Sequence, residues 1–408
     1  MKSASGTVLL LLSTSVFADW KFSGNVAPYF QQIMVDPSPI SPRQKSGVSA
    51  SLNLENKMSS KWRFRSDVWF RTDFFAKDAQ ETFQYIPKNV HFQYRSREFT
   101  FRGGFQTMQI DGPDIINPAD IVHSKNWVDP TTPVTQSSLG LSFSQEKGDW
   151  NWEVLYVPRQ TPALLPGAHS PWLPRKNRLP IESEDTEIRI PNDVEYQYLG
   201  AKILNNALNH NVTLKIQRKT DAIETQFLYY NGLSNAPYVL TRVTGTLLSV
   251  NPDVIAVSSP VRLQPLYYRQ HALAGTFNLP LGSWAVHGGI NWMKPQGHDV
   301  RTPSESSLGV LGVEKSFETG LGMVTTVVDY VRQELQNDNQ ISFLRSIFQN
   351  ALAAGVRVPI GEETQVFAGG IYDLTGASSL YRASVSRRVT SSLSVEGQAQ
   401  FLQGPSKT

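Results

Sequence analysis

Residues 98–145, EFTFRGGFQTMQIDGPDIINPADIVHSKNWVDPTTPVTQSSLGLSFSQ, contain two alternating runs separated by a long polar segment. In residues 99–106, aromatic residues and glycine alternate with polar residues, and in residues 138–145 leucine and phenylalanine alternate with small or polar ones. A period of two is typical of a β-strand with one apolar and one polar face. The stretch therefore predicts two amphipathic strands joined by one large loop, which in a closed barrel can cover the mouth or fold inward.

The same alternation recurs along the chain from Trp20 onward, and we count about 17 strands of roughly 9 to 12 residues, the length that a tilted strand needs to cross a bilayer. Residues 195–204 and 211–230 each count as one strand here, although the second is long enough to be a hairpin. Short turns alternate with long links, which is typical of outer-membrane barrels with short periplasmic turns and long external loops. We expect an all-β, antiparallel, up-and-down transmembrane β-barrel of about 16–18 strands.

Aromatic residues gather at the ends of the predicted strands, where they fit the girdles that barrels place at the two membrane interfaces. The alternative is that they are ordinary core aromatics, but the opposite strand faces are polar. The residues are Trp20, Trp62, Trp150, Trp284, Trp292 and Tyr330.

Composition excludes several classes of function. Charged residues make up 18% of the 408 residues, against roughly 25% in an average soluble domain. The formal net charge of +3 arises from scattered Lys and Arg, which gives no reason to expect nucleic-acid binding. The absence of cysteine excludes thiol catalysis, thiolate metal sites and disulfides.

The N-terminus predicts export. Lys2 precedes an apolar run from Val8 through Phe17, and small or apolar residues end at Ala18, so residues 1–18 fit a signal peptide cut after Ala18. A membrane anchor is the alternative, but the apolar run is about 10 residues and a spanning helix needs about 20. Residues 19–408 are then the barrel. Because single-chain bacterial barrels have even strand numbers and residues 403–406 read like the start of another external loop, we also expect that a final strand is missing, unless residues 211–230 are a hairpin and the count is wrong.

Two motifs resemble a known family. Gly104-Phe105-Gln106 followed by Asp114-Ile115-Ile116-Asn117-Pro118-Ala119-Asp120 is similar to a porin-like family of proteobacterial outer-membrane β-barrels, in which a strand ending in Gly-x-Gln leads into a loop with Asp-x-x-Asn-Pro-x-Asp. Residues 150–172 are similar to the family's strand that ends in aromatic-x-Pro and continues into a Pro-rich external loop. Residues 107–110 depart from the Trp-Gly that often follows the Gln. The family has no agreed activity, so the resemblance implies a fold and a location in the bacterial outer membrane.

Opposite charges are expected to meet inside the barrel. Basic residues lie on the polar faces of three consecutive strands, and the loop that follows carries acidic ones, so together they can set ion preference at a constriction. The alternative is that they pair and hold the loop in place, and both roles are compatible. The pore-lining candidates are Arg63, Arg65, Arg95, Arg102, Asp111, Asp114 and Asp120.

The Asn117-Pro118 pair predicts a short helix over residues 118–122, because Asn suits an N-cap and Pro the first helical turn. We interpret this motif as architectural rather than as a ligand site.

These observations favour a channel for small hydrophilic solutes or ions, with loop 108–133 narrowing the lumen. A conduit for hydrophobic solutes or lipids, a lipid-acting barrel enzyme, and a sheath for a periplasmic partner are the alternatives. We expect no catalytic activity, cofactor or metal, since the seven histidines lack metal-ligand spacing and no phosphate-binding or nucleophile motif occurs. The expected partners are outer-membrane lipid and small solutes, with room for an oligomer or a periplasmic partner and none for nucleic acid.

Overall fold

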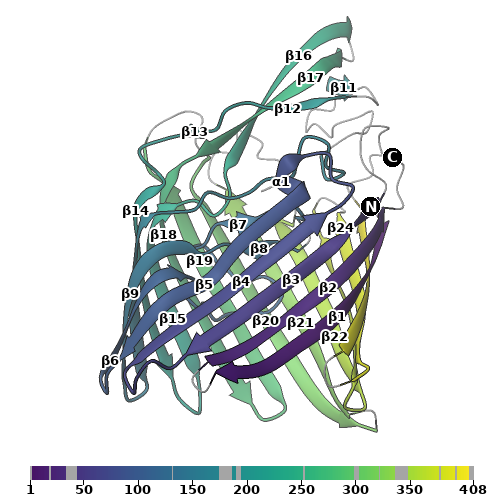
Figure 1. Cartoon of the computed structure of the whole chain (residues 1–408). Coiled ribbons are helices and arrows are strands. Elements are labelled where there is room, and N and C mark those ends of the chain that lie inside the picture. Colours follow the sequence, from purple (N-terminus) through teal and green to yellow (C-terminus); the bar gives the residue numbers. More distant parts are fainter. Residues whose placement is uncertain are drawn as a thin grey trace.

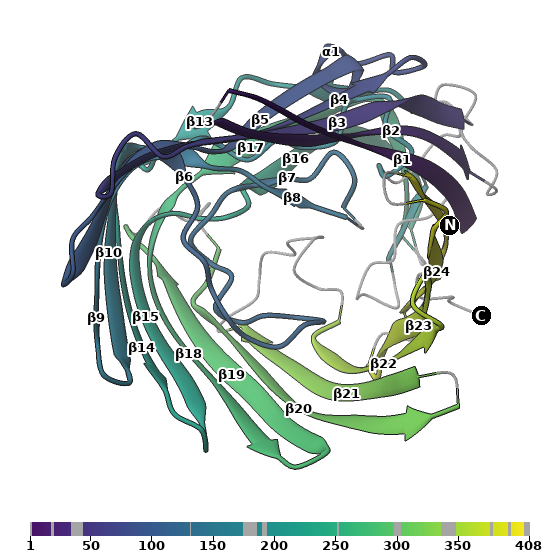
Figure 2. The same cartoon turned by 60° about the horizontal axis from the view of Figure 1, so that its bottom comes forward.

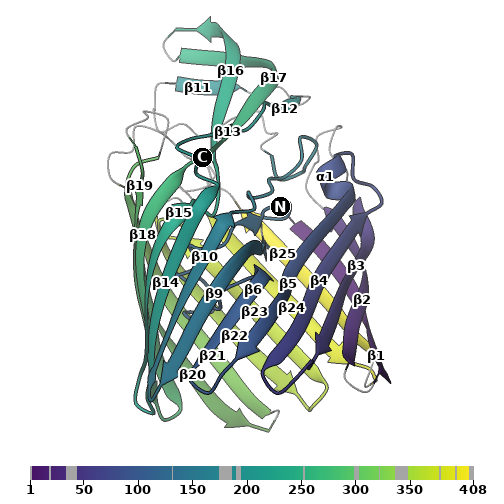
Figure 3. The same cartoon turned by 60° about the vertical axis from the view of Figure 1, so that its left-hand side comes forward.

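A curved antiparallel sheet dominates the molecule, and a smaller group of strands projects from one of its rims (Figures 1 and 3). The candidate functional site lies inside the large sheet. The computed structural model describes residues 2–17, 20–33, 44–130, 132–173, 186–189, 194–250, 253–297, 303–320, 322–335, 348–375, 378–390 and 393–403, with the backbone alone for residues 2–17, 33, 186–189 and 335.

The large sheet has 18 strands, each antiparallel to the next around the barrel. Its predicted class, an all-β up-and-down barrel, is confirmed. The strands are β1 (Lys2–Phe17), β2 (Trp20–Ile33), β3 (Gln44–Asn56), β4 (Trp62–Asp73), β5 (Phe83–Arg95), β6 (Phe99–Gln106), β9 (Ser138–Lys147), β10 (Trp150–Arg159), β14 (Asn209–Lys219), β15 (Glu224–Leu233), β18 (Arg269–Leu281), β19 (Trp284–Pro295), β20 (Ser306–Thr319), β21 (Gly322–Leu335), β22 (Asn350–Ile360), β23 (Thr364–Asp373), β24 (Ser379–Arg388) and β25 (Leu393–Gln403).

Strand β1 joins the two ends of the series that runs from β2 to β25. Lys2 lies opposite Phe401 of β25, and Phe17 lies opposite Trp20 of β2, so β1 occupies the position between them. These are the residues for which the sequence predicts a signal peptide. Cleavage after Ala18 and a missing final strand stay predictions.

The predicted strand count is close to the observed one because two errors cancel. Residues 211–230 belong to a hairpin of β14 and β15, joined by a turn in which the Thr220 hydroxyl bonds to the backbone of Ile223. Residues 195–204 contain no barrel strand: they form β12 (Tyr196–Tyr198) and β13 (Lys202–Ile203), which pair in parallel with β17 (Asp253–Tyr267) outside the barrel.

Short turns and long links alternate around the barrel, as expected, so the two rims differ. Trp62, Trp150 and Trp284 each begin a strand directly after a short turn, and Trp20 begins β2. They are 40–51% exposed, and an aromatic girdle at the rim of short turns accounts for this pattern. The Lys315 ammonium nitrogen lies 4.3 Å from the centroid of the Trp284 ring, so this ring can also hold a cation at the interface.

The long links carry the other elements. The link between β4 and β5 contains α1 (Ala79–Thr82). Residues 107–137, which we call the inner loop, contain β7 (Lys125–Asn126) and β8 (Val134–Thr135), and they lie inside the ring of strands in Figure 2. The projecting sheet consists of β11 (Thr186–Arg189), β12, β13, β16 (Tyr238–Ser249) and β17.

The two faces of the barrel differ in polarity. Large apolar side chains on the outer face are exposed, among them Phe92, Ile290 and Leu311 at 51%, 62% and 58%. The alternate positions of the same strands point inward and include His91, Asn291 and Gly312. An apolar exterior around a polar interior is the arrangement expected of a barrel that crosses lipid. No helix among the described residues has the length and hydropathy to cross a membrane.

Candidate functional site

The inner loop buries its own apolar side chains against one wall of the lumen. Met108, Ala119, Ile121 and Val122 are each at most 4% exposed. They pack against inward-facing residues of β10, β15 and β18, which are Leu155, Val157, Leu228, Tyr230, Ala272 and Ala274. Burial of this apolar surface draws the loop across the lumen and holds it there.

Hydrogen bonds from the same wall fix the backbone of the loop around Asp111. The Gln226 side chain accepts from the Asp111 N–H and donates to its carbonyl, both at 3.2 Å, and the Thr276 hydroxyl donates to that carbonyl at 3.1 Å. The Lys215 ammonium donates to the Gln109 carbonyl at 3.0 Å. Buried backbone polar groups need such partners, and the barrel wall supplies them.

The Asn-Pro motif forms a turn, and the helix predicted over residues 118–122 is absent. The Asn117 carboxamide oxygen accepts from the Ala119 N–H at 2.9 Å, and its nitrogen donates to the Ile110 carbonyl at 3.3 Å. Asn291 of β19 donates to the Pro118 carbonyl at 2.6 Å. Residues 119, 121 and 122 are all buried. These contacts support the architectural interpretation of the motif.

A buried histidine connects the middle of the inner loop to its start. The His123 Nε2 atom lies 2.9 Å from the Met108 amide nitrogen and 3.2 Å from the Met108 carbonyl oxygen. Burial lowers the pKa of His123, although the charge of Asp120 and the Met108 contact act in the opposite direction. The ring is therefore neutral near pH 7 and accepts the Met108 N–H.

The predicted arginines lie on the wall strands β4, β5 and β6, and the predicted aspartates lie on the inner loop, which packs against another part of the wall. Arg63 pairs with Glu55 at 3.1 Å, and Arg102 pairs with Glu153 at 3.4 Å, while Glu153 also pairs with Lys215 at 3.3 Å. Arg65 and Arg95 are exposed. Among the described ion pairs and hydrogen bonds, none joins these four arginines to Asp111, Asp114 or Asp120, because apolar burial carries the loop to the wall of β10 to β19.

The three predicted aspartates differ in their surroundings. The Asp111 carboxylate accepts from Gln217 of β14 at 2.8 Å. Asp120 pairs with Lys125 of the same loop at 2.5 Å, and Asp114 is exposed. Asp111 and Asp120 therefore help to hold the loop, and an effect of the three on ion preference stays a prediction.

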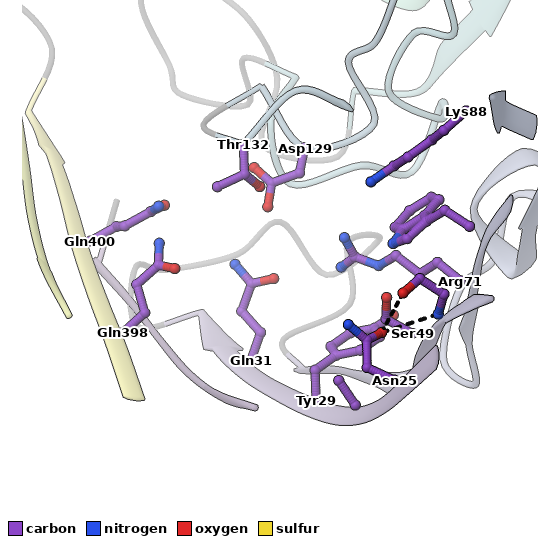
Figure 4. A pocket seen from close by; sticks show the side chains of 13 residues that line it. Asn25, Tyr29, Gln31, Ser49, Arg71, Lys88, Asp129, Thr132, Gln398 and Gln400 are labelled. Carbon is purple, nitrogen blue, oxygen red and sulfur yellow. Dashed lines mark hydrogen bonds between the residues drawn. The ribbon is translucent and has the colours of Figure 1, made fainter. Parts of the chain in front are cut away.

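A cavity of about 360 Å³ remains between the inner loop and the opposite wall. Figure 4 shows its lining side chains converging from the wall, from β25 and from the loop. They are Asn25, Ala27, Tyr29 and Gln31 of β2, Ser49 and Ser51 of β3, Trp69 and Arg71 of β4, Lys88 of β5, Asp129 and Thr132 of the inner loop, and Gln398 and Gln400 of β25.

The charges at this cavity come from residues that the sequence analysis did not select. Arg71 and Lys88 lie on the strand wall, and Asp129 lies on the loop across from them (Figure 4). Arg71 shares its strand face with Arg63 and Arg65, so the period of two could have identified it. Lys88 could not have been placed in this way, because a β-bulge between the pairs Asp67–Asn89 and Val68–Pro87 changes the register there.

The fold and this interior define the class of protein. An antiparallel barrel with an apolar exterior, a tryptophan girdle, short turns at one rim and long loops at the other is an outer-membrane β-barrel. The described residues contain no group of three or more His, Asp or Glu side chains placed to hold a metal ion.

Known structures of similar architecture are outer-membrane proteins. Salmonella typhi OmpF in complex with daunomycin is 9% identical, with a TM-score of 0.45 over 98% of this chain and 97% of that one. In vitro folded OmpT of Vibrio cholerae is 8% identical, with a TM-score of 0.43 over 99% and 97%. A mutant of Rh. blastica porin is 9% identical, with a TM-score of 0.40 over 98% and 99%. No protein-family model matches the sequence, and no curated protein does.

Proposed function

We propose that this barrel is a non-enzymatic channel for small hydrophilic solutes and ions across the outer membrane. The observation that carries the proposal is the inner loop, which is packed on one wall and leaves a polar, charged cavity beside the other. In a channel, such a loop sets the size of the constriction, and the charges around it set ion preference.

The chemistry of the cavity supports hydrophilic rather than hydrophobic cargo. Its lining combines amides, hydroxyls and charged groups, which exchange hydrogen bonds with a hydrated solute. At roughly 30 Å³ for each molecule of liquid water, its volume corresponds to about a dozen waters, which is room for one small solute. A lipid conduit needs an apolar path through the wall instead.

Planar-bilayer recordings of the purified protein test the proposal. We expect stepwise conductance in KCl, and a potential measured across a KCl gradient reports ion preference. Stable insertion without conductance would overturn the channel and favour a plugged barrel, a lipid-acting enzyme or a structural sheath.

Ion preference should respond to Asp129, which lines the cavity. Asp129→Asn removes a negative charge there, so the reversal potential should move toward anions. Asp120→Asn is the matched control: Asp120 is an inner-loop carboxylate paired with Lys125 at 2.5 Å and not part of the cavity lining. Equal shifts in both variants would show that Asp129 has no special position in the conducting path.

A further inference from the structure

Two cationic side chains on the strand wall of the cavity point into the open space. In Figure 4, the Arg71 guanidinium and the Lys88 ammonium both face the cavity, with Asp129 across from them. Neither cation forms an ion pair within the part of the chain that the structure describes. Among the residues that line the cavity, two cations therefore face one carboxylate.

Arg71 is held in a fixed orientation. Its guanidinium lies over the Tyr29 ring, 4.3 Å from the centroid, and the Tyr29 hydroxyl donates to the Thr72 carbonyl at 3.0 Å. The planar N–H edge of a guanidinium matches the geometry of a carboxylate. Lys88 adds a second charge from the bulge in β5.

Neutral hydrogen-bonding groups surround the two cations. Gln31, which is 7% exposed, and Ser49 come from β2 and β3, and Thr132 comes from the inner loop. Amides and hydroxyls both donate and accept, so they suit the hydroxyl groups of a solute. These side chains, with Tyr29, Arg71 and Lys88, belong to β2 to β5 and the inner loop, so the arrangement does not depend on the position of β1.

We propose that Arg71, Lys88, Tyr29 and Gln31 form a binding subsite for small polyhydroxylated carboxylates, the chemical class of sugar acids. The carboxylate binds the N–H edge of Arg71 and the ammonium of Lys88, while the hydroxyl groups bind the amide and hydroxyl lining. The subsite rests on the proposed channel and adds to it a preferred class of solute.

Gluconate and sorbitol are the matched probes, because both are linear six-carbon polyols and only gluconate carries a carboxylate. Added to a bilayer that holds the conducting protein, gluconate should reduce the KCl current at a concentration about tenfold lower than sorbitol needs, since a hydrogen bond to a charged group contributes about that factor. The double variant Arg71→Gln and Lys88→Gln should abolish the difference. Arg63→Gln, at a cation already paired with Glu55, should preserve it.

A binding measurement without conductance separates the subsite from the channel. Trp69 lines the same cavity, so gluconate should change the tryptophan fluorescence of the detergent-solubilised protein, and Trp69→Phe should remove most of that change. Equal effects of gluconate and sorbitol, or block and fluorescence unchanged by the double variant, would overturn the subsite while leaving the channel intact. Gluconate binding without any conductance would keep the subsite and overturn the channel.

Discussion

One glycine allows a histidine and an aspartate to form a hydrogen bond across a strand of the barrel wall. His287 of β19, Gly312 of β20 and Asp329 of β21 lie directly opposite one another, and His287 Nε2 is 2.7 Å from the Asp329 carboxylate. Both side chains reach over Gly312, where a Cβ atom would overlap the Asp329 carboxylate and lie 2.5 Å from His287 Nε2. A single missing methyl group therefore determines whether two strands can share a hydrogen bond.

Gly312→Ala should destabilise the barrel by about 1–3 kcal/mol, because the added methyl group forces apart a buried pair that has no room to move. Urea unfolding in detergent, followed by tryptophan fluorescence, measures the change in free energy. Gly309→Ala in the same strand is the control, since its Cβ would meet only the Arg332 carbonyl oxygen at 3.9 Å. If both variants unfold at the same urea concentration, the His287–Asp329 contact is not a structural constraint.

At the scale of single elements, strand periodicity predicted most of the barrel strands. It failed where tertiary contacts determine which segments pair and where a loop packs. The alternating runs correspond to β2 to β6, β9, β10 and β18 to β25, because each such strand buries one face in lipid and the other in the lumen. Residues 195–204 alternate in the same way but pair outside the barrel. The inner loop was expected to fold inward, and it does, but its destination depends on which wall offers a matching apolar surface, and no local pattern contains that information.

The anchoring of the inner loop should depend on pH through His123. Burial lowers its pKa in the packed loop, whereas a released loop titrates near the ordinary value of about 6.5. The packed state therefore has its full stability above pH ~6.5, and acidification below that value favours release, by up to about tenfold for each pH unit until the lowered pKa is reached. Hydrogen exchange of the inner-loop amides, corrected for the intrinsic effect of pH, measures this release.

His123→Gln provides the comparison, because a glutamine amide can still accept the Met108 N–H but does not titrate. Exchange in this variant should vary less between pH 7.5 and 5.5 than in the wild type. The same pH dependence in both proteins would assign the effect to another group.

At the scale of the whole molecule, the side chains of the barrel and those of the projecting sheet have different surroundings. The barrel exposes apolar side chains to lipid, whereas the hairpin of β16 and β17 extends beyond the rim in Figures 1 and 3. Residues 241–250 are all exposed, and the hairpin tip carries Leu247, Leu248 and Val250 at 54%, 57% and 72% exposure. Two buried residues of this sheet, Val257 and Val261, pack against Val194 and form a cluster separate from the barrel core.

The tip of this hairpin should therefore be dispensable for the channel. Thr246 and Ala256 are directly paired, so residues 247–255 can be replaced by Asn-Gly, which forms a tight turn between two antiparallel strands. Val257 and the core of the projecting sheet remain. We expect unchanged conductance and ion preference, because none of the described residues among those deleted lines the cavity. By contrast, deleting residues 129–132 from the inner loop should raise conductance, since Asp129 and Thr132 form one side of the cavity. Loss of conductance on removal of the hairpin tip, or unchanged conductance without residues 129–132, would contradict this prediction. Either result would indicate that the narrowest part of the path lies at the external rim and not in the lumen.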